Sequence, residues 1–213
     1  MPPAGKRGKY LGFVAHELKN PLATALWSCD LLKRLEAHDR TGERADKMID
    51  VSLRALRRMR RLIDDFFTIE RLLEHGYELK AEPVAIKALV DFALQTLAVK
   101  DGFDTSGWAV EVGAARTTGD LEMLKKAVRA AIEHMARGSQ KPRLSIRADE
   151  SSLSIRAEPP PSPIVPPAPE ERPSGDPAGA VLGFALAASI LEAHGGRLEE
   201  RDGALAVVFA GSD

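Results

Sequence analysis

The sequence has one cysteine, no long apolar run and almost no net charge. Cys29 is the only cysteine among 213 residues, which excludes an intramolecular disulfide and a thiolate-bound metal. No segment approaches the ~18 apolar residues of a membrane span, and the N-terminus lacks the apolar centre of a signal peptide, so we expect a cytoplasmic protein. The 30 basic and 31 acidic residues leave a net charge of -1, which argues against nucleic acid as a partner.

Apolar residues recur at steps of three and four along the first third of the chain, which predicts two helices over about residues 9–37 and 43–73, each about 45 Å long. The first pattern comprises Leu11, Val14, Leu18, Leu22, Ala25, Cys29 and Leu32, and the second comprises Met48, Val51, Ala55, Met59, Leu62, Phe66 and Ile69. This pattern places Cys29 in the core. Two helices with one apolar face each cannot enclose a core, so we expect a homodimer that forms a four-helix bundle.

The rest of the chain alternates between short helical and strand patterns. Helices are predicted at about 84–99, 120–137 and 179–194, a strand at 108–112, and hairpins within 142–157 and 197–209. Nine of the 14 prolines lie between Pro159 and Pro177, which predicts a long surface loop. The expected fold is therefore α+β: a helical hairpin in residues 1–76, followed in residues 77–213 by an α/β sandwich with helices on a sheet of antiparallel type.

A histidine, a carboxylate and an amide lie close together on the first predicted helix. His16 and Asn20 are four residues apart and share a face, while Leu18 and Leu22 are expected on the buried face. The Glu17 side chain is long enough to accept a hydrogen bond from the His16 Nδ1–H group, which would leave Nε2 as a nucleophile. A solvated surface histidine is the alternative interpretation of an isolated residue.

The string HELKNP at residues 16–21 closely resembles the phospho-acceptor box of sensor histidine kinases, which lies in their dimerisation and histidine phosphotransfer domain. The resemblance implies that His16 accepts a phosphoryl group and that Glu17 assists. It implies that Asn20 positions water for dephosphorylating a response regulator. It also implies that the second domain has the Bergerat-type ATPase fold, with Gly179 and Gly183 in the last glycine box.

The sequence departs from that family at the nucleotide site. The two family asparagines fall on Ala130 and His134, and imidazole is a poor ligand for Mg²⁺, which the second asparagine normally holds. Where the family has D-x-G-x-G, this chain has Glu158 followed by three prolines, which offer neither N–H groups nor positive φ. The nucleotide positions His134, Glu158, Gly179 and Gly183 are therefore interpreted as vestigial. Close helix packing explains the two glycines equally well.

The expected loss of nucleotide affinity is large. Each lost polar contact costs roughly 1–3 kcal/mol, so three losses lower the affinity by about two to six decades. We therefore expect no ATP, metal or other cofactor.

The leading interpretation is a phosphotransfer protein in which His16 exchanges phosphate with the aspartates of response-regulator receiver domains. One alternative is an active sensor kinase core that uses ATP and Mg²⁺ at a divergent site. Another is a non-catalytic pseudokinase or phosphatase module that binds a regulator.

Two further features suggest a partner. Five arginines crowd the second helix, at positions 54, 57, 58, 60 and 61, and form either a solvated face or a docking surface for an acidic regulator domain. Trp27 lies outside the apolar pattern, which suits either a partner contact or additional core packing.

His194 precedes two glycines that end a helix, where partial positive charge is favourable, and has no expected catalytic role.

Overall fold

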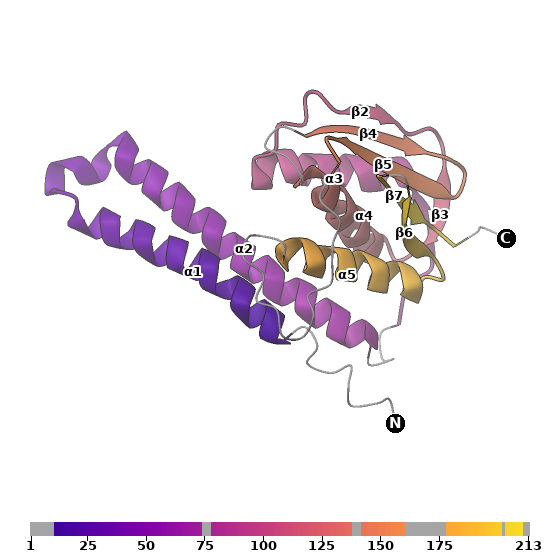
Figure 1. Cartoon of the computed structure of the whole chain (residues 1–213), viewed down its shortest axis with the longest axis horizontal. Helices are drawn as coiled ribbons and strands as arrows, with labels where there is room; N and C mark the ends of the chain where they lie inside the picture. The colour runs from indigo at the N-terminus through magenta and orange to yellow at the C-terminus, as the bar shows by residue number, and fades with distance from the viewer. Residues whose placement is uncertain (1–10, 74–77, 138–141, 161–177, 202, 211–213) are drawn as a thin grey trace. The chain divides into compact units, whose positions relative to one another are not determined.

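The structure is a computed structural model that describes residues 11–73, 78–137, 142–160, 178–201 and 203–210 (Figure 1). The chain forms two compact units, Met1–Phe67 and Thr68–Asp213. The predicted domain boundary after residue 76 lies outside the described residues, as does the predicted proline-rich loop 159–177 apart from its first two residues.

The first unit is a helical hairpin. Helix α1 (Leu11–Arg34) is followed by a short 3-10 helix, η1 (Ala37–Thr41), and by α2 (Glu43–Leu73), whose last residues belong to the second unit. Both helices predicted from the apolar spacing are confirmed.

Small side chains line the seam between α1 and α2. Ala25 and Ser28 are buried on α1, and the Ser52 hydroxyl of α2 donates to the carbonyls of Met48 at 3.0 Å and Ala25 at 3.4 Å. In the single chain Leu22 is 46% exposed and Cys29 is exposed, so neither lies in the seam of the hairpin. The seam follows positions 14, 17, 21, 25 and 28 instead, which turns Leu22 and Cys29 outward.

A second set of apolar side chains on the hairpin is exposed. Apart from Trp27, these residues form one row on each helix, which we call the exposed apolar stripe: Leu22 and Leu26 on α1, and Ile49, Leu53, Leu56, Ile63 and Phe67 on α2. The spacing of three, four or seven residues on α2 keeps the row on one face. The hairpin therefore has two apolar faces, one toward its own seam and one uncovered in the single chain.

The second unit contains a five-stranded sheet in the order β2-β4-β5-β7-β6. Its strands are β2 (Ala109–Glu111), β4 (Arg143–Ala148), β5 (Ser152–Glu158), β6 (Arg197–Arg201) and β7 (Ala204–Val208). The expectation of an antiparallel sheet is wrong at one edge, because β2 pairs with β4 in parallel. A helix lies between these two strands in the chain and provides the crossover that a parallel pair needs.

A separate two-stranded sheet was not foreseen from the sequence. Strands β1 (Glu82–Ala85) and β3 (Arg116–Gly119) pair antiparallel. Each strand is only four residues long, and Pro83 within the first argues against a strand prediction. Neither segment therefore shows a clear alternating pattern. β1 ends where the next helix begins.

Three helices cover one face of the larger sheet: α3 (Ile86–Asp101), α4 (Leu121–Ala136) and α5 (Ala178–Ala193) (Figure 1). Alternate residues of β4, β5 and β7 point into the layer between sheet and helices, as the burial of Ile146, Ile155 and Val207 shows. The predicted α/β sandwich is therefore present, with a mixed rather than antiparallel sheet.

Asp120 and His194 join the start of α4 to the end of α5. The Asp120 carboxylate accepts from the amides of Glu122 and Met123, each at 3.1 Å, and caps α4. The Asp120 amide donates to His194 Nε2 at 3.0 Å, while His194 Nδ1 lies 2.7 Å from the Ile190 carbonyl. Because a carbonyl can only accept, Nδ1 carries the proton and the ring is neutral. The positive charge expected for His194 at this helix end is therefore replaced by a structural hydrogen bond.

Candidate functional site

His16 lies in the second turn of α1 with its side chain 53% exposed. A partner can therefore reach the imidazole. The exposure follows from position: His16 directly precedes the seam residue Glu17, and one residue along a helix turns the side chain by about 100°.

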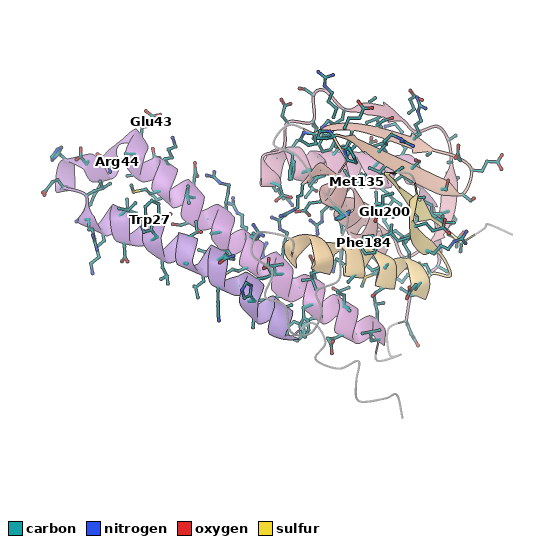
Figure 2. The ribbon with its side chains drawn as sticks, in the orientation of Figure 1. Trp27, Glu43, Arg44, Met135, Phe184 and Glu200 are labelled. Carbon is teal, nitrogen blue, oxygen red and sulfur yellow. The ribbon has the colours of Figure 1, made fainter. Side chains whose placement is uncertain are left out.

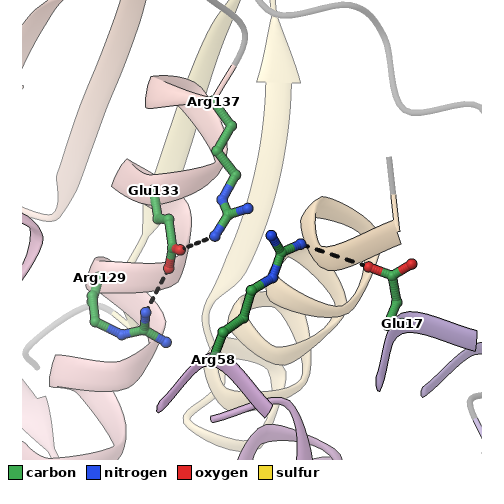
Figure 3. Close-up of polar contacts among 5 residues, drawn as sticks. All are labelled: Glu17, Arg58, Arg129, Glu133 and Arg137. Atoms are coloured by element: carbon green, nitrogen blue, oxygen red, sulfur yellow. Dashed lines mark hydrogen bonds and ion pairs between the residues drawn. The ribbon is translucent and has the colours of Figure 1, made fainter. Parts of the chain in front are cut away.

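Glu17 is the only buried acidic side chain in the described part of the hairpin, and it is 3% exposed. One carboxylate oxygen lies 3.7 Å from His16 Nδ1, and the other lies 3.8 Å from an Nη atom of Arg58 on α2 (Figure 3). Both distances exceed a hydrogen bond, so the contacts are electrostatic. A carboxylate on this side of the ring favours a proton on Nδ1 and leaves Nε2 available for attack.

Asn20 lies one turn after His16 and is exposed. The Thr24 hydroxyl donates to the Asn20 backbone carbonyl at 3.0 Å. Pro21 is buried in the seam and has no amide hydrogen to donate to the Glu17 carbonyl, so the helix lacks one internal bond at this turn. The structure thus places His16, Glu17 and Asn20 on one turn of α1.

The second unit holds the other predicted positions, and His134 is the most informative of them. Its side chain is 6% exposed on α4, and its ring meets the edge of Phe184 of α5 at 5.6 Å between centroids. Among the described residues, Nδ1 has no hydrogen-bond partner. Burial, and then the charge of Arg137, lowers the pKa of His134 below its ordinary value of 6.5. His134 is therefore a neutral ring packed between two helices.

Arg129 and Glu133 of α4 and Arg137, directly after this helix, form a charged network that was not predicted from the sequence. Arg129 donates to the Glu133 carboxylate at 2.5 Å, and Arg137 pairs with the other oxygen of the same carboxylate (Figure 3). Arg129 is 8% exposed, so these charges are paired inside the unit. The repeated four-residue step from Arg129 to Glu133 to Arg137 was the available signal.

The remaining positions predicted from the nucleotide motifs lie apart from one another in the chain. Glu158 is exposed at the end of β5, and Gly179 lies in the first turn of α5. A Cβ atom added to Gly183 would meet no atom of the described residues within 4 Å, so the close packing offered as an explanation for this glycine is absent there. The described residues contain no group of three or more His, Cys, Asp or Glu side chains placed to hold a metal ion.

The helical hairpin matches a known protein family. Residues 6–74 match the family described as the His Kinase A (phospho-acceptor) domain. No curated protein matches the chain.

Among solved structures, the Acinetobacter baumannii histidine kinase AdeS aligns with a TM-score of 0.61 and 16% identity, covering 92% of this chain and 97% of that one. The mycobacterial sensor histidine kinase MprB aligns with a TM-score of 0.45 and 21% identity, covering 61% of this chain and 97% of that one. A histidine kinase from Burkholderia phymatum aligns with a TM-score of 0.40 and 18% identity, covering 92% of this chain and 95% of that one. The comparison of folds rests on AdeS, because the other two scores are below 0.5.

The hairpin with its exposed histidine matches the phospho-acceptor domain family, and the chain shares the fold of the histidine kinase AdeS. The match to the His Kinase A (phospho-acceptor) domain covers residues 6–74, which include His16. Proteins with this domain normally dimerise and pair with response regulators. None of the described helices combines the length and apolar character needed to cross a membrane.

The buried neutral His134 predicts a pH-dependent stability. Below pH 6.5 the unfolded chain protonates this histidine, whereas the folded unit resists protonation because the pKa of His134 is lowered. The unfolded state then binds more protons, so the contribution of neutral His134 is complete above pH 6.5 and is lost as the pH falls toward the folded pKa, by at most about 1.4 kcal/mol per pH unit.

Urea unfolding between pH 8 and pH 5 measures this effect as the difference between the wild type and His134→Phe. The variant should lose less stability on acidification. His38→Gln provides the control, because the His38 side chain is 79% exposed and should leave the wild-type pH profile unchanged. Parallel profiles for the wild type and His134→Phe would contradict the assignment.

Proposed function

We propose that His16 accepts a phosphoryl group from, and donates it to, the aspartate of a response-regulator receiver domain. The observation that carries this proposal is the half-exposed imidazole whose Nδ1 faces the buried carboxylate of Glu17 at 3.7 Å. The carboxylate orients the ring and stabilises the positive charge that develops on it, while Nε2 stays available to the partner. In this scheme Glu17 is a positioning residue and His16 is the nucleophile.

The transfer step is balanced without a further reactant. Nε2 of His16 attacks the phosphorus of the aspartyl phosphate, a P–N bond forms, and the bond from phosphorus to the aspartate oxygen breaks. The aspartate leaves as a carboxylate, and the proton on Nδ1 remains beside Glu17. Because the phosphorylated imidazole is positively charged, the nearby carboxylate stabilises it, and the same step in reverse returns the phosphoryl group.

We also propose that the second unit binds Mg-ATP weakly or not at all. Two features of α4 support this. Ala130 replaces a polar side chain with a methyl group that is 2% exposed, and the ring of His134 packs against Phe184. An imidazole held in apolar packing is a poor ligand for Mg²⁺, which prefers oxygen.

We further propose that two copies of the hairpin pair to form a four-helix bundle. The exposed apolar stripe supports this proposal, because Leu26 on α1 is 59% exposed and Leu53 and Leu56 on α2 are 40% and 47% exposed. A second copy would cover these side chains and remove their apolar surface from water.

Phosphoryl transfer to His16 is the first test. A receiver domain phosphorylated on its aspartate with a labelled small-molecule phosphodonor should pass the label to the wild-type chain, while His16→Ala should receive none. Glu17→Gln should slow the transfer, by about tenfold if the lost charge stabilises the transition state by about 1.4 kcal/mol. Absence of label on the wild type across a full set of receiver domains would refute the proposal.

Nucleotide binding separates this scheme from an active kinase core. Isothermal titration with Mg-ATP should show no binding tighter than about 100 μM, as expected from the loss of several polar contacts. Titration of a conventional histidine kinase core in the same buffer is the control. Tighter binding, or incorporation of label into His16 from ATP, would show that the kinase alternative is correct.

Self-association is measured by sedimentation equilibrium. The wild type should be a dimer, and Leu53→Asp should be a monomer at the same concentration, because a buried unpaired carboxylate is strongly unfavourable. Val99→Asp is the matched control, since Val99 on α3 is 77% exposed and lies outside the stripe. Equal masses for the wild type and Leu53→Asp would exclude this interface.

A further inference from the structure

Arg58 and His16 face the two oxygens of the same carboxylate. One oxygen of Glu17 lies 3.7 Å from His16 Nδ1, and the other lies 3.8 Å from an Nη atom of Arg58 (Figure 3). Because neither contact is as short as a hydrogen bond, the carboxylate is shared between the two basic side chains. Together the contacts place the guanidinium within about 10 Å of the ring nitrogen, which is about one Debye length at physiological salt or less.

The two basic groups differ in when they carry charge. The guanidinium of Arg58 is positive in every state of the protein, because arginine is not deprotonated in proteins. In the proposed transfer, the ring of His16 becomes positive when Nε2 takes up the phosphoryl group and Nδ1 keeps its proton. Phosphorylation therefore adds a second cation beside a carboxylate that already faces one.

The burial of Glu17 makes the carboxylate sensitive to both cations. Its side chain is 3% exposed, whereas the side chains of Arg58 and His16 are 31% and 53% exposed. A buried carboxylate cannot readily replace a protein partner by water, so a gain of contact with one cation at the expense of the other changes its free energy. Arg58 lies on α2 and His16 on α1, which means that the two cations approach Glu17 from different helices.

We propose that Arg58 sets the phosphoryl-transfer potential of His16 by competing with phosphohistidine for the carboxylate of Glu17. This inference rests on the proposed function. On phosphorylation, the Nδ1–H group draws the carboxylate toward a hydrogen bond, and the contact with Arg58 weakens. The loss of that contact makes phosphohistidine less stable than it would be beside Glu17 alone. Arg58 is thus a positioning residue that favours donation of the phosphoryl group, while Glu17 favours its acceptance.

The two members of this ion pair therefore have opposite effects on the transfer equilibrium. An ion pair that only held the hairpin together would give the same direction for the loss of either partner. A contact that only bound the receiver domain would change the forward and reverse rates alike and leave the equilibrium between the free proteins unchanged. The equilibrium constant thus distinguishes the proposed role of Arg58 from a structural role and from a binding role.

The distribution of label between the chain and a receiver domain measures this equilibrium. The ratio of labelled chain to labelled receiver is determined at concentrations well below half-saturation and is approached from each phosphorylated protein in turn. Arg58→Gln should shift the equilibrium about tenfold toward phosphohistidine, because one like charge near the ring is lost. Glu17→Gln should shift it toward the phosphorylated receiver.

A graded variant and a double variant complete the comparison. Arg58→Lys keeps the charge without the planar fork, so it should shift the equilibrium in the same direction as Arg58→Gln by a smaller factor. This variant also provides the test if Arg58→Gln does not fold. In a chain that already carries Glu17→Gln, the change Arg58→Gln should shift the equilibrium less than about twofold, because the two residues act as one unit.

Two other arginines of α2 provide matched controls. Arg54 lies one turn before Arg58 on the same side of the helix. Arg44 lies near the start of α2 (Figure 2), about 21 Å from Arg58 along the helix axis. Arg54→Gln and Arg44→Gln remove the same charge as Arg58→Gln and should leave the equilibrium unchanged.

The possible outcomes separate this inference from the proposed function. An absence of label on the wild-type chain would refute the proposed function, on which the inference rests. Transfer with an equilibrium that Arg58→Gln leaves unchanged, or shifts toward the phosphorylated receiver, would overturn the role of Arg58 and retain the proposed function. An equal shift with and without the Glu17 carboxylate would also overturn the inference, because Arg58 would not act through Glu17.

Discussion

A single buried carboxylate links the packing of the helical hairpin to its exposed histidine. Glu17 is 3% exposed, with one oxygen toward the imidazole of His16 and the other toward the guanidinium of Arg58. A carboxylate removed from water is costly unless positive charge surrounds it, and here one of its neighbours is the ring that would become positive in the proposed phosphorylation. The interaction therefore connects the packing of the hairpin seam to the chemistry of the exposed histidine, because the same residue belongs to both.

The two units differ in the side chains at their candidate sites. The hairpin retains a histidine, a carboxylate and an amide on one turn of α1, which is the chemistry of a phospho-acceptor domain. In the second unit, Ala130 and His134 on α4 are buried, and the His134 ring packs against Phe184. Paired charges on α4 add rigidity without an obvious ligand, since one glutamate satisfies two arginines.

Prediction from the sequence was most accurate where a periodic apolar pattern extends over many residues. The hairpin helices follow three- and four-residue steps over more than twenty residues, so their extents could be predicted closely. The sequence was least informative about which neighbouring helix or strand each apolar face packs against. Leu22 and Cys29 belong to a helical apolar pattern, yet the seam selects Ala25 and Ser28, since small residues allow the two helices to approach. The parallel β2–β4 pair and the short β1–β3 sheet depend on contacts distant in sequence, which local patterns do not encode.

The site residues show the same difference between local sequence patterns and contacts distant in sequence. The HELKNP string gave His16, Glu17 and Asn20 directly, whereas the burial of Glu17 and its contact with Arg58 required the register of α1 against α2. The neutral state of His194 followed only from its two hydrogen bonds, one from the amide of Asp120 and one to the carbonyl of Ile190. The Glu17–Arg58 and Asp120–His194 contacts join residues that lie dozens of positions apart in the chain.

The most direct test of the central claim offers the protein both phosphate sources in parallel and locates the phosphoryl group by mass spectrometry under conditions that preserve phosphohistidine. The account predicts phosphate on His16 after incubation with a phosphorylated receiver domain and none after incubation with Mg-ATP alone. Phosphohistidine formed from Mg-ATP alone, or a phosphorylated receiver that leaves His16 unmodified, would contradict it.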